Sequence, residues 1–228
     1  MYNTTSSDNM SKLYEFNKYV LDKCNSLEYK DSLACPLLVS SNPLFEQNLD
    51  RRIMYIGQEN NGWVNWNETS YEYTQELIEY RYFEFLQNGA TTTEFWQFIS
   101  KVLNVPREQL INKIVWNNTL ICGKRYEAGP PECDDTLKNL SLENLLFLFE
   151  YFNPEYTIFV NGPNNPYYDI TIKFLKEIKS KLQDYYPKVN NPMLVDEDKK
   201  IIWTYHPNYQ KRKSLHHEII PNIRNIIK

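Results

Sequence analysis

Short apolar runs alternate along the chain with longer segments whose apolar residues recur every three or four positions. The short runs have the length and composition of buried strands, at 53–56, 114–116, 157–160 and 201–205. The longer segments have the spacing of helices, at 11–27, 70–87, 93–103, 141–152, 166–182 and 214–227. This alternation predicts an α/β fold with a parallel sheet covered by helices on both faces.

The boundaries of these elements carry local signals. Thr93 and Ser141 are residue types that cap helix N-termini, and Pro166 suits a first helical turn. Residues 1–10 are polar, and we expect them to be disordered. With no internal repeat or linker, we expect residues 11–228 to form a single domain.

The overall charge limits the choice of partners. The chain of 228 residues has a net charge of −4, which does not fit a tight non-specific nucleic-acid binder. A nucleic-acid contact would therefore need a local basic patch, for which Lys211, Arg212 and Lys213 are candidates. The polar N-terminus and the short apolar runs predict a soluble cytoplasmic protein with no membrane contact.

The cysteines and histidines give no metal-binding pattern. The four cysteines, Cys24, Cys35, Cys122 and Cys133, lack any CxxC spacing. The chain has only three histidines, which disfavours a histidine-rich metal site. We therefore expect free, buried thiols, no metal and no cofactor.

The four predicted strands all end in polar segments. These segments are Gly57-Gln58-Glu59, Asn117-Asn118, Asn161-Gly162 and His206-Pro207. In a parallel sheet they meet at one edge, where open α/β sheets bind their ligands. A carboxylate and an imidazole can stabilise charge on a ligand, and an amide can form hydrogen bonds to the edge of a flat polar ring. Phosphate-binding glycine loops and the GxSxG nucleophile motif are absent.

Three of these segments resemble motifs of the uracil-DNA glycosylase superfamily, in the family's order. Residues 57–61 (GQENN) are similar to the first motif, which varies around GQDPY and GEAPG. Residues 117–122 (NNTLIC) resemble the family's TNVVKC segment, and residues 204–210 (TYHPNYQ) its HPSPL and TYHPSxLLR segments. Any one of these residues alone is also what an ordinary turn would carry, so the resemblance rests on the combined order.

The resemblance implies a three-layer α/β/α sandwich around a four-stranded parallel sheet. It also implies a DNA glycosylase that acts as a monomer on DNA, flips a pyrimidine out of the stack and hydrolyses its N-glycosidic bond. Glu59 falls at the catalytic position that orients water, and His206 at the one that donates to the base. Gln58 and Asn118 would contact the base, although Asn117 competes with Asn118. Asn208, Tyr209, Lys211 and Arg212 would contact the DNA.

The chain departs from the family pattern in ways that leave the substrate open. Asn60 replaces the usual proline, and Asn61 replaces the tyrosine that blocks the 5-methyl group of thymine. Uracil is the family's default substrate and implies repair. The smaller Asn61 would instead admit a bulky 5-modified cytosine, as in some phage DNA, and imply antiphage defence.

Further departures concern the aromatic residues and the cysteines. Trp63, or else Trp66, is the nearest candidate to stack on the base. Gln210 aligns with the hydrophobic wedge, so Tyr209 would intercalate instead. One branch of the family binds a 4Fe–4S cluster, but the cysteine spacing here departs from that branch and favours free thiols.

Two other functions remain open on the sequence. The same fold without turnover would be a nucleic-acid-binding module. A small-molecule hydrolase with Glu59 as general base is a third hypothesis, which the basic run after His206 disfavours.

Overall fold

A computed structural model describes residues 5–43, 45, 53–60 and 74–228. Its centre is a five-stranded sheet in the order β2-β1-β3-β5-β4. The strands are β1 (Ile53–Gly57), β2 (Ile114–Asn118), β3 (Tyr156–Phe159), β4 (Met193–Asp196) and β5 (Ile201–Thr204). The predicted four parallel strands are confirmed, and β4 is added antiparallel to β5 at one edge. The four parallel strands are almost wholly buried, which explains their continuous apolar runs.

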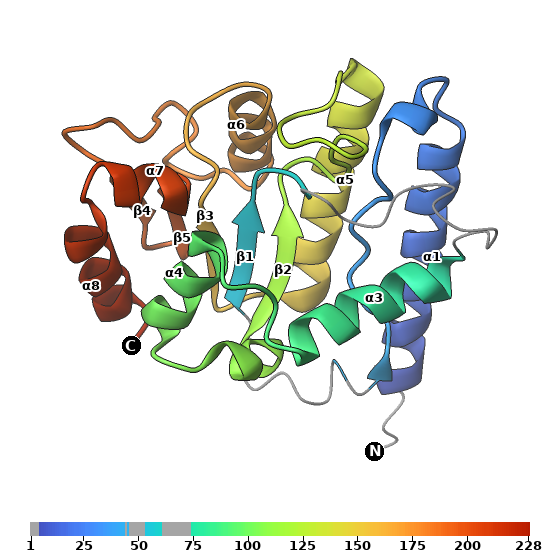
Figure 1. Ribbon diagram of the computed structural model, residues 1–228, viewed down its shortest axis with the longest axis horizontal. Helices are drawn as coiled ribbons and strands as arrows, with labels where there is room; N and C mark the ends of the chain where they lie inside the picture. The colour runs from blue at the N-terminus through green and yellow to red at the C-terminus, as the bar shows by residue number, and fades with distance from the viewer. Residues whose placement is uncertain (1–4, 44, 46–52, 61–73) are drawn as a thin grey trace.

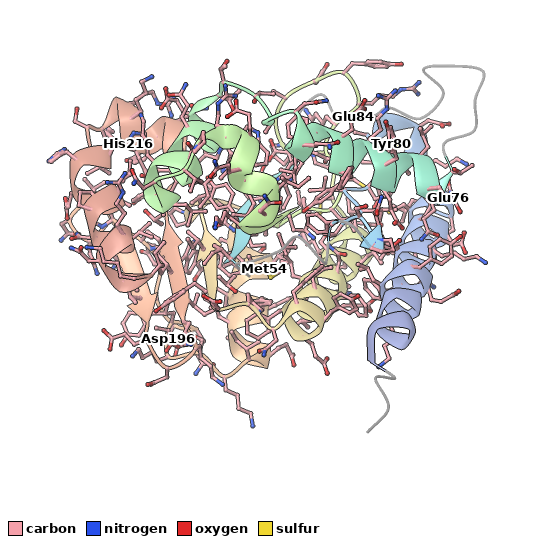
Figure 2. All side chains as sticks on the ribbon, turned by 90° about the horizontal axis from the view of Figure 1, so that it is seen from below. Met54, Glu76, Tyr80, Glu84, Asp196 and His216 are labelled. Carbon is pink, nitrogen blue, oxygen red and sulfur yellow. The ribbon has the colours of Figure 1, made fainter. Side chains whose placement is uncertain are left out.

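Helices cover both faces of this sheet and give a three-layer α/β/α sandwich (Figures 1 and 2). The helices are α1 (Thr5–Asn25), α3 (Gln75–Gln87), α4 (Glu94–Leu103), α5 (Asp135–Phe152), α6 (Tyr167–Glu177), α7 (Pro207–Arg212) and α8 (His216–Ile226). Short 3-10 turns occur at Lys30–Ser32 and Arg107–Asn112. Helices α5 and α6 pack together on one face, and α4 packs with α8 on the other. In the described part of the chain, no helix is long and apolar enough to cross a membrane.

Three predicted helix starts differ from the structure by five residues or more. The helix predicted from residue 70 begins at Gln75, with Thr74 as its N-cap. Helix α1 begins at Thr5, so residues 5–10, expected to be disordered, are helical, while residues 1–4 lie outside the described residues. Once later turns are packed, a helix extends at little cost through polar residues. Helix α5 is capped by Asp134, whose carboxylate accepts from Leu137 N, and the predicted cap Ser141 was wrong. Ser141 lies inside the helix and donates to Leu137 O at 2.7 Å.

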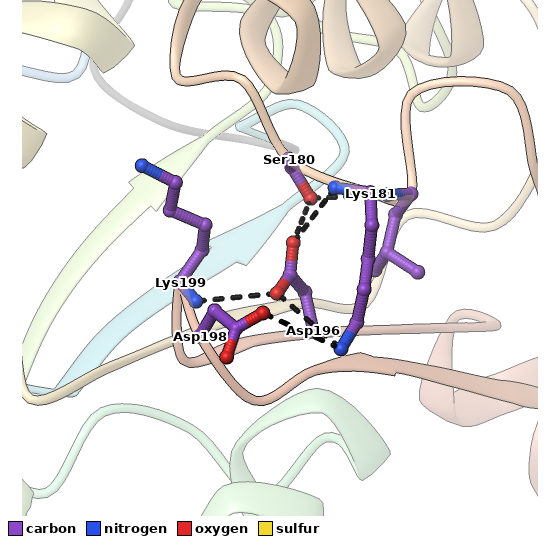
Figure 3. A network of polar contacts seen from close by, with 6 residues as sticks. Ser180, Lys181, Asp196, Asp198 and Lys199 are labelled. Carbon is purple, nitrogen blue, oxygen red and sulfur yellow. Dashed lines mark hydrogen bonds and ion pairs between the residues drawn. The ribbon is translucent and has the colours of Figure 1, made fainter.

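The edge strand β4 is held by a buried carboxylate (Figure 3). Asp196 is 1% exposed and accepts hydrogen bonds from Ser180 Oγ at 2.6 Å and from the backbone N–H groups of Lys181 and Lys199. Burial by itself would raise the pKa of this carboxyl. The hydrogen bonds outweigh it and hold the pKa below its usual range. The network joins the chain after α6 to the β4–β5 turn.

The opposite edge strand, β2, is closed by a tyrosine. Tyr82 of α3 donates its hydroxyl to Trp116 O at 3.0 Å and accepts from Trp116 N at 2.9 Å. These are the backbone groups that an edge strand leaves unpaired, so one phenol satisfies both. The carboxyl ends of β1 and β2 are thereby fixed side by side, with Gly57 opposite Asn118.

Candidate functional site

The end of β1 is crowded, and only glycine fits there. A Cβ atom on Gly57 would lie 2.5 Å from Asn118 Oδ1 and 2.8 Å from Phe95 Cε2, closer than real contacts allow. Phe95 comes from the first turn of α4, and Asn118 ends β2. The missing side chain therefore lets an amide from β2 and a ring from α4 meet at the strand end.

The loop after Gly57 is fixed from three sides. Gln58 Nε2 donates to Asn161 O at 2.9 Å, and Gln58 O accepts from Leu120 N at 2.9 Å. The next anchor is Asn60, which is 2% exposed and donates through Nδ2 to Cys35 O at 2.9 Å. Asn60, which departs from the family's proline, thus ties the loop to a neighbouring segment. Glu59 stands between these two anchors.

The carboxylate of Glu59 is held by a phenol. Tyr167, in the first turn of α6, is buried and donates its hydroxyl to Glu59 Oε2. Burial, followed by the negative charge of Glu59, raises the pKa of Tyr167 well above its usual range. The phenol therefore stays protonated as a permanent donor. The sequence pattern did not identify Tyr167 as a site residue, although it is the first aromatic residue after the polar end of β3.

The two asparagines that end β2 face opposite sides of the sheet, as successive strand residues do. Asn118 is 2% exposed, and its Oδ1 accepts from Trp116 Nε1 at 3.3 Å on the Gly57 side. Asn117 instead folds back, and its Oδ1 accepts from Asn118 N at 2.6 Å. The buried Nδ2 of Asn118 has no hydrogen-bond partner among the described residues. Within the described part of the chain, it is an unsatisfied buried donor at the end of β2, as is Asn117 Nδ2.

His206 follows β5 and caps the short helix α7. Its Nδ1 accepts from Asn208 N at 3.3 Å. Burial, followed by the positive charge of Arg212, lowers the pKa of the imidazole to about 4. The ring is therefore neutral at pH 7. Because Nδ1 accepts, the proton lies on Nε2, which becomes a neutral donor.

Phe95 connects the histidine to the end of β1. Its ring centroid lies 6.0 Å from that of His206, with 21° between the ring planes. The same ring lies where a Cβ atom on Gly57 would be. Its backbone is held where Tyr55 donates to Phe95 O at 2.9 Å. In the sequence, Phe95 stands out only as an apolar position in an amphipathic helix. The predicted Trp63 and Asn61, like Trp66, lie outside the described residues.

The polar end of β3 supports the site without belonging to it. Asn161 is fully buried and donates to Thr119 Oγ1 at 2.6 Å and to Thr171 Oγ1 at 2.7 Å. Its Oδ1 accepts from Trp203 Nε1 at 2.8 Å. Every polar group of this side chain is engaged, so Asn161 fastens neighbouring strands and α6 to one another.

The predicted DNA-contacting residues lie on α7, a helix that the sequence did not predict. Asn208 and Arg212 are exposed, and Tyr209 is half-buried. Lys211 is exposed but forms an ion pair with Glu94 of α4. Gln210, aligned with the family's wedge, is fully buried and donates to Tyr205 O.

The cysteines are free thiols, three of them buried. Cys24 Sγ lies 3.8 Å from Cys122 Sγ. Among the described residues, no three or more His, Cys, Asp or Glu side chains are grouped as a metal site would require.

Comparison of the chain with protein-family models gives no match, and a comparison with curated proteins gives none either.

Proposed function

We propose that this protein is a DNA glycosylase that hydrolyses the N-glycosidic bond of a flipped pyrimidine and leaves an abasic site. The observation that carries the proposal is the placement of Glu59, Asn118 and His206 at the carboxyl ends of three parallel strands. The site combines a carboxylate, an amide donor with no partner among the described residues, and a neutral imidazole donor. These three groups match the needs of glycosidic hydrolysis.

In this mechanism Glu59 orients a water molecule toward C1′ of the flipped nucleotide. The C1′–N bond breaks with its electron pair on the base, and the carboxylate stabilises the oxocarbenium-like sugar. The water oxygen then bonds to C1′, and its proton leaves to the carboxylate. Tyr167 donates to one carboxylate oxygen and thereby orients the carboxylate.

The leaving base takes the negative charge, and His206 stabilises it. Its Nε2–H donates to a base oxygen as charge develops, a contribution of ~2–4 kcal/mol to the barrier. Asn118 Nδ2 donates to another acceptor on the base edge. Phe95, beside His206, offers a ring face on which the flipped base would stack.

The test is an abasic-site assay on oligonucleotides that carry uracil or one of several bulky 5-modified cytosines. Purified protein followed by alkali should cleave at least one of them. Glu59→Gln and His206→Ala should each lower the rate by about 100-fold or more. The matched control is His217→Ala, which alters an exposed histidine of α8 and should leave the rate unchanged.

The panel also separates the alternatives. Cleavage of uracil DNA alone favours repair, and cleavage of modified-cytosine DNA favours defence. Binding of DNA without any abasic product, unchanged by Glu59→Gln and by His206→Ala, would favour the binding-module hypothesis.

A further inference from the structure

Three tyrosines form an aromatic tract beside the proposed site. Tyr205 and Tyr209 stack with ring centroids 4.5 Å apart at 28°. Tyr205 also donates its hydroxyl to Pro187 O at 3.0 Å, which fastens the segment 183–189 to the end of β5. Tyr186 belongs to this segment and is 42% exposed. In Figure 1 the chain between α6 and β4 runs next to α7.

Cationic side chains lie over two of these rings. Lys188 Nζ lies 5.0 Å from the ring centroid of Tyr186, and Lys213 Nζ lies 6.0 Å from that of Tyr209. Arg212 is exposed on the same short helix as Tyr209. Aromatic faces bordered by lysine and arginine provide stacking for bases and positive charge for phosphates.

The tract is continuous with the site. Tyr205 immediately precedes His206, and a Cβ on Gly162, at the end of β3, would lie 3.5 Å from Tyr205 Cδ1. Tyr186 meets Tyr168 edge to face at 5.9 Å, and Tyr168 stacks on Trp203 of β5. Nucleotides next to a base bound at His206 would therefore pass over Tyr205 and Tyr186, whereas Trp203 is buried beneath them.

We propose that Tyr186, Tyr205 and Tyr209, with Lys188 and Lys213, form a platform that binds unpaired nucleotides flanking the target base. The inference rests on the proposed function and adds a preference for single-stranded DNA. Ring faces can stack only on bases that are unstacked from their neighbours. The chain's net charge of −4 also disfavours binding that relies on duplex phosphates alone.

The test is fluorescence anisotropy of a labelled pyrimidine 12-mer that lacks any excisable base, measured single-stranded and as a duplex. We expect tighter binding of the single strand. Tyr186→Ala should weaken that binding about tenfold, while Tyr186→Phe, which keeps the ring, should retain it. The control is Tyr80→Ala, because Tyr80 is 54% exposed on α3. Figure 2 shows Tyr80 at the other end of the molecule from His216, which contacts Pro207 of α7.

The outcomes separate this platform from the catalytic proposal. If Tyr186→Ala binds the single strand as the wild type does, or if the duplex binds more tightly, the platform is refuted even when the protein excises a base. If Tyr186→Ala loses single-strand binding and Tyr80→Ala does not, the platform stands even when no substrate is excised.

Discussion

Acidification should destabilise this protein through one histidine, His206. The pKa of a free imidazole is near 6.5, whereas burial and Arg212 lower that of His206 to about 4. This difference corresponds to at most about 3 kcal/mol of stability. Protonation would also remove the acceptor that Nδ1 presents to Asn208 N.

The sign follows from proton linkage. Between pH 6.5 and pH 4 the unfolded chain binds a proton at this residue and the folded chain does not. Stability is therefore complete above pH 6.5 and falls as the pH drops toward the folded pKa. By pH 4.5 the loss from His206 alone should reach about 2 to 3 kcal/mol.

Urea unfolding at pH 7 and pH 4.5 measures this loss when the wild type is compared with His206→Gln. The glutamine variant does not titrate, so the wild type should lose about 2 to 3 kcal/mol more than the variant between these pH values. His217→Gln, an exposed control, should follow the wild type. Parallel losses in wild type and His206→Gln would refute the low pKa. NMR titration is a second check, because the chain has only three histidines to assign.

Three further predictions concern groups that hold the site and the sheet. Tyr167→Phe removes the phenol that donates to the proposed catalytic carboxylate. It should lower kcat about ten- to 100-fold with little change in KM, whereas Tyr168→Phe should not. Gly57→Ala forces a Cβ against Asn118 and should cost about 1–3 kcal/mol in urea unfolding. Asp196→Asn should cost about 1–3 kcal/mol at pH 7. That difference should shrink at acidic pH as the wild-type carboxyl, whose pKa is below its usual range, takes up a proton.

The sequence predicted the parallel strands because helices cover both of their faces. Such strands are continuous apolar runs, and polar residues mark their ends. The sequence pattern did not predict strand β4 (Met193–Asp196) because the strand is short and only every second residue in it is buried. Its strand conformation depends on pairing with β5. The predicted start of α5 lay too late in the sequence because serine, here Ser141, is a frequent N-cap residue. Here its hydroxyl bonds back inside the helix, a choice that only tertiary packing decides.

The candidate site shows the same contrast between residues that the local sequence pattern marks and residues that only tertiary packing positions. Glu59, Asn118 and His206 were predictable because polar residues at strand ends stand out from the apolar runs before them. Phe95 and Tyr167 occupy ordinary apolar positions of helices, and neither position differs in pattern from the core. Their roles follow only from the direction in which α4 and α6 approach the sheet.

Glu59 and His206 are each contacted by a residue from a helix on one face of the sheet. Tyr167 of α6 holds Glu59 from one layer of the sandwich, and Phe95 of α4 lies against His206 from the other. The sheet supplies the chemical groups, and the two helical layers fix their orientation. Because the layers approach from opposite faces, a shift of either one would move the carboxylate and the imidazole independently. The relative geometry of the two groups therefore depends on the packing of the whole sandwich, not on the loops alone.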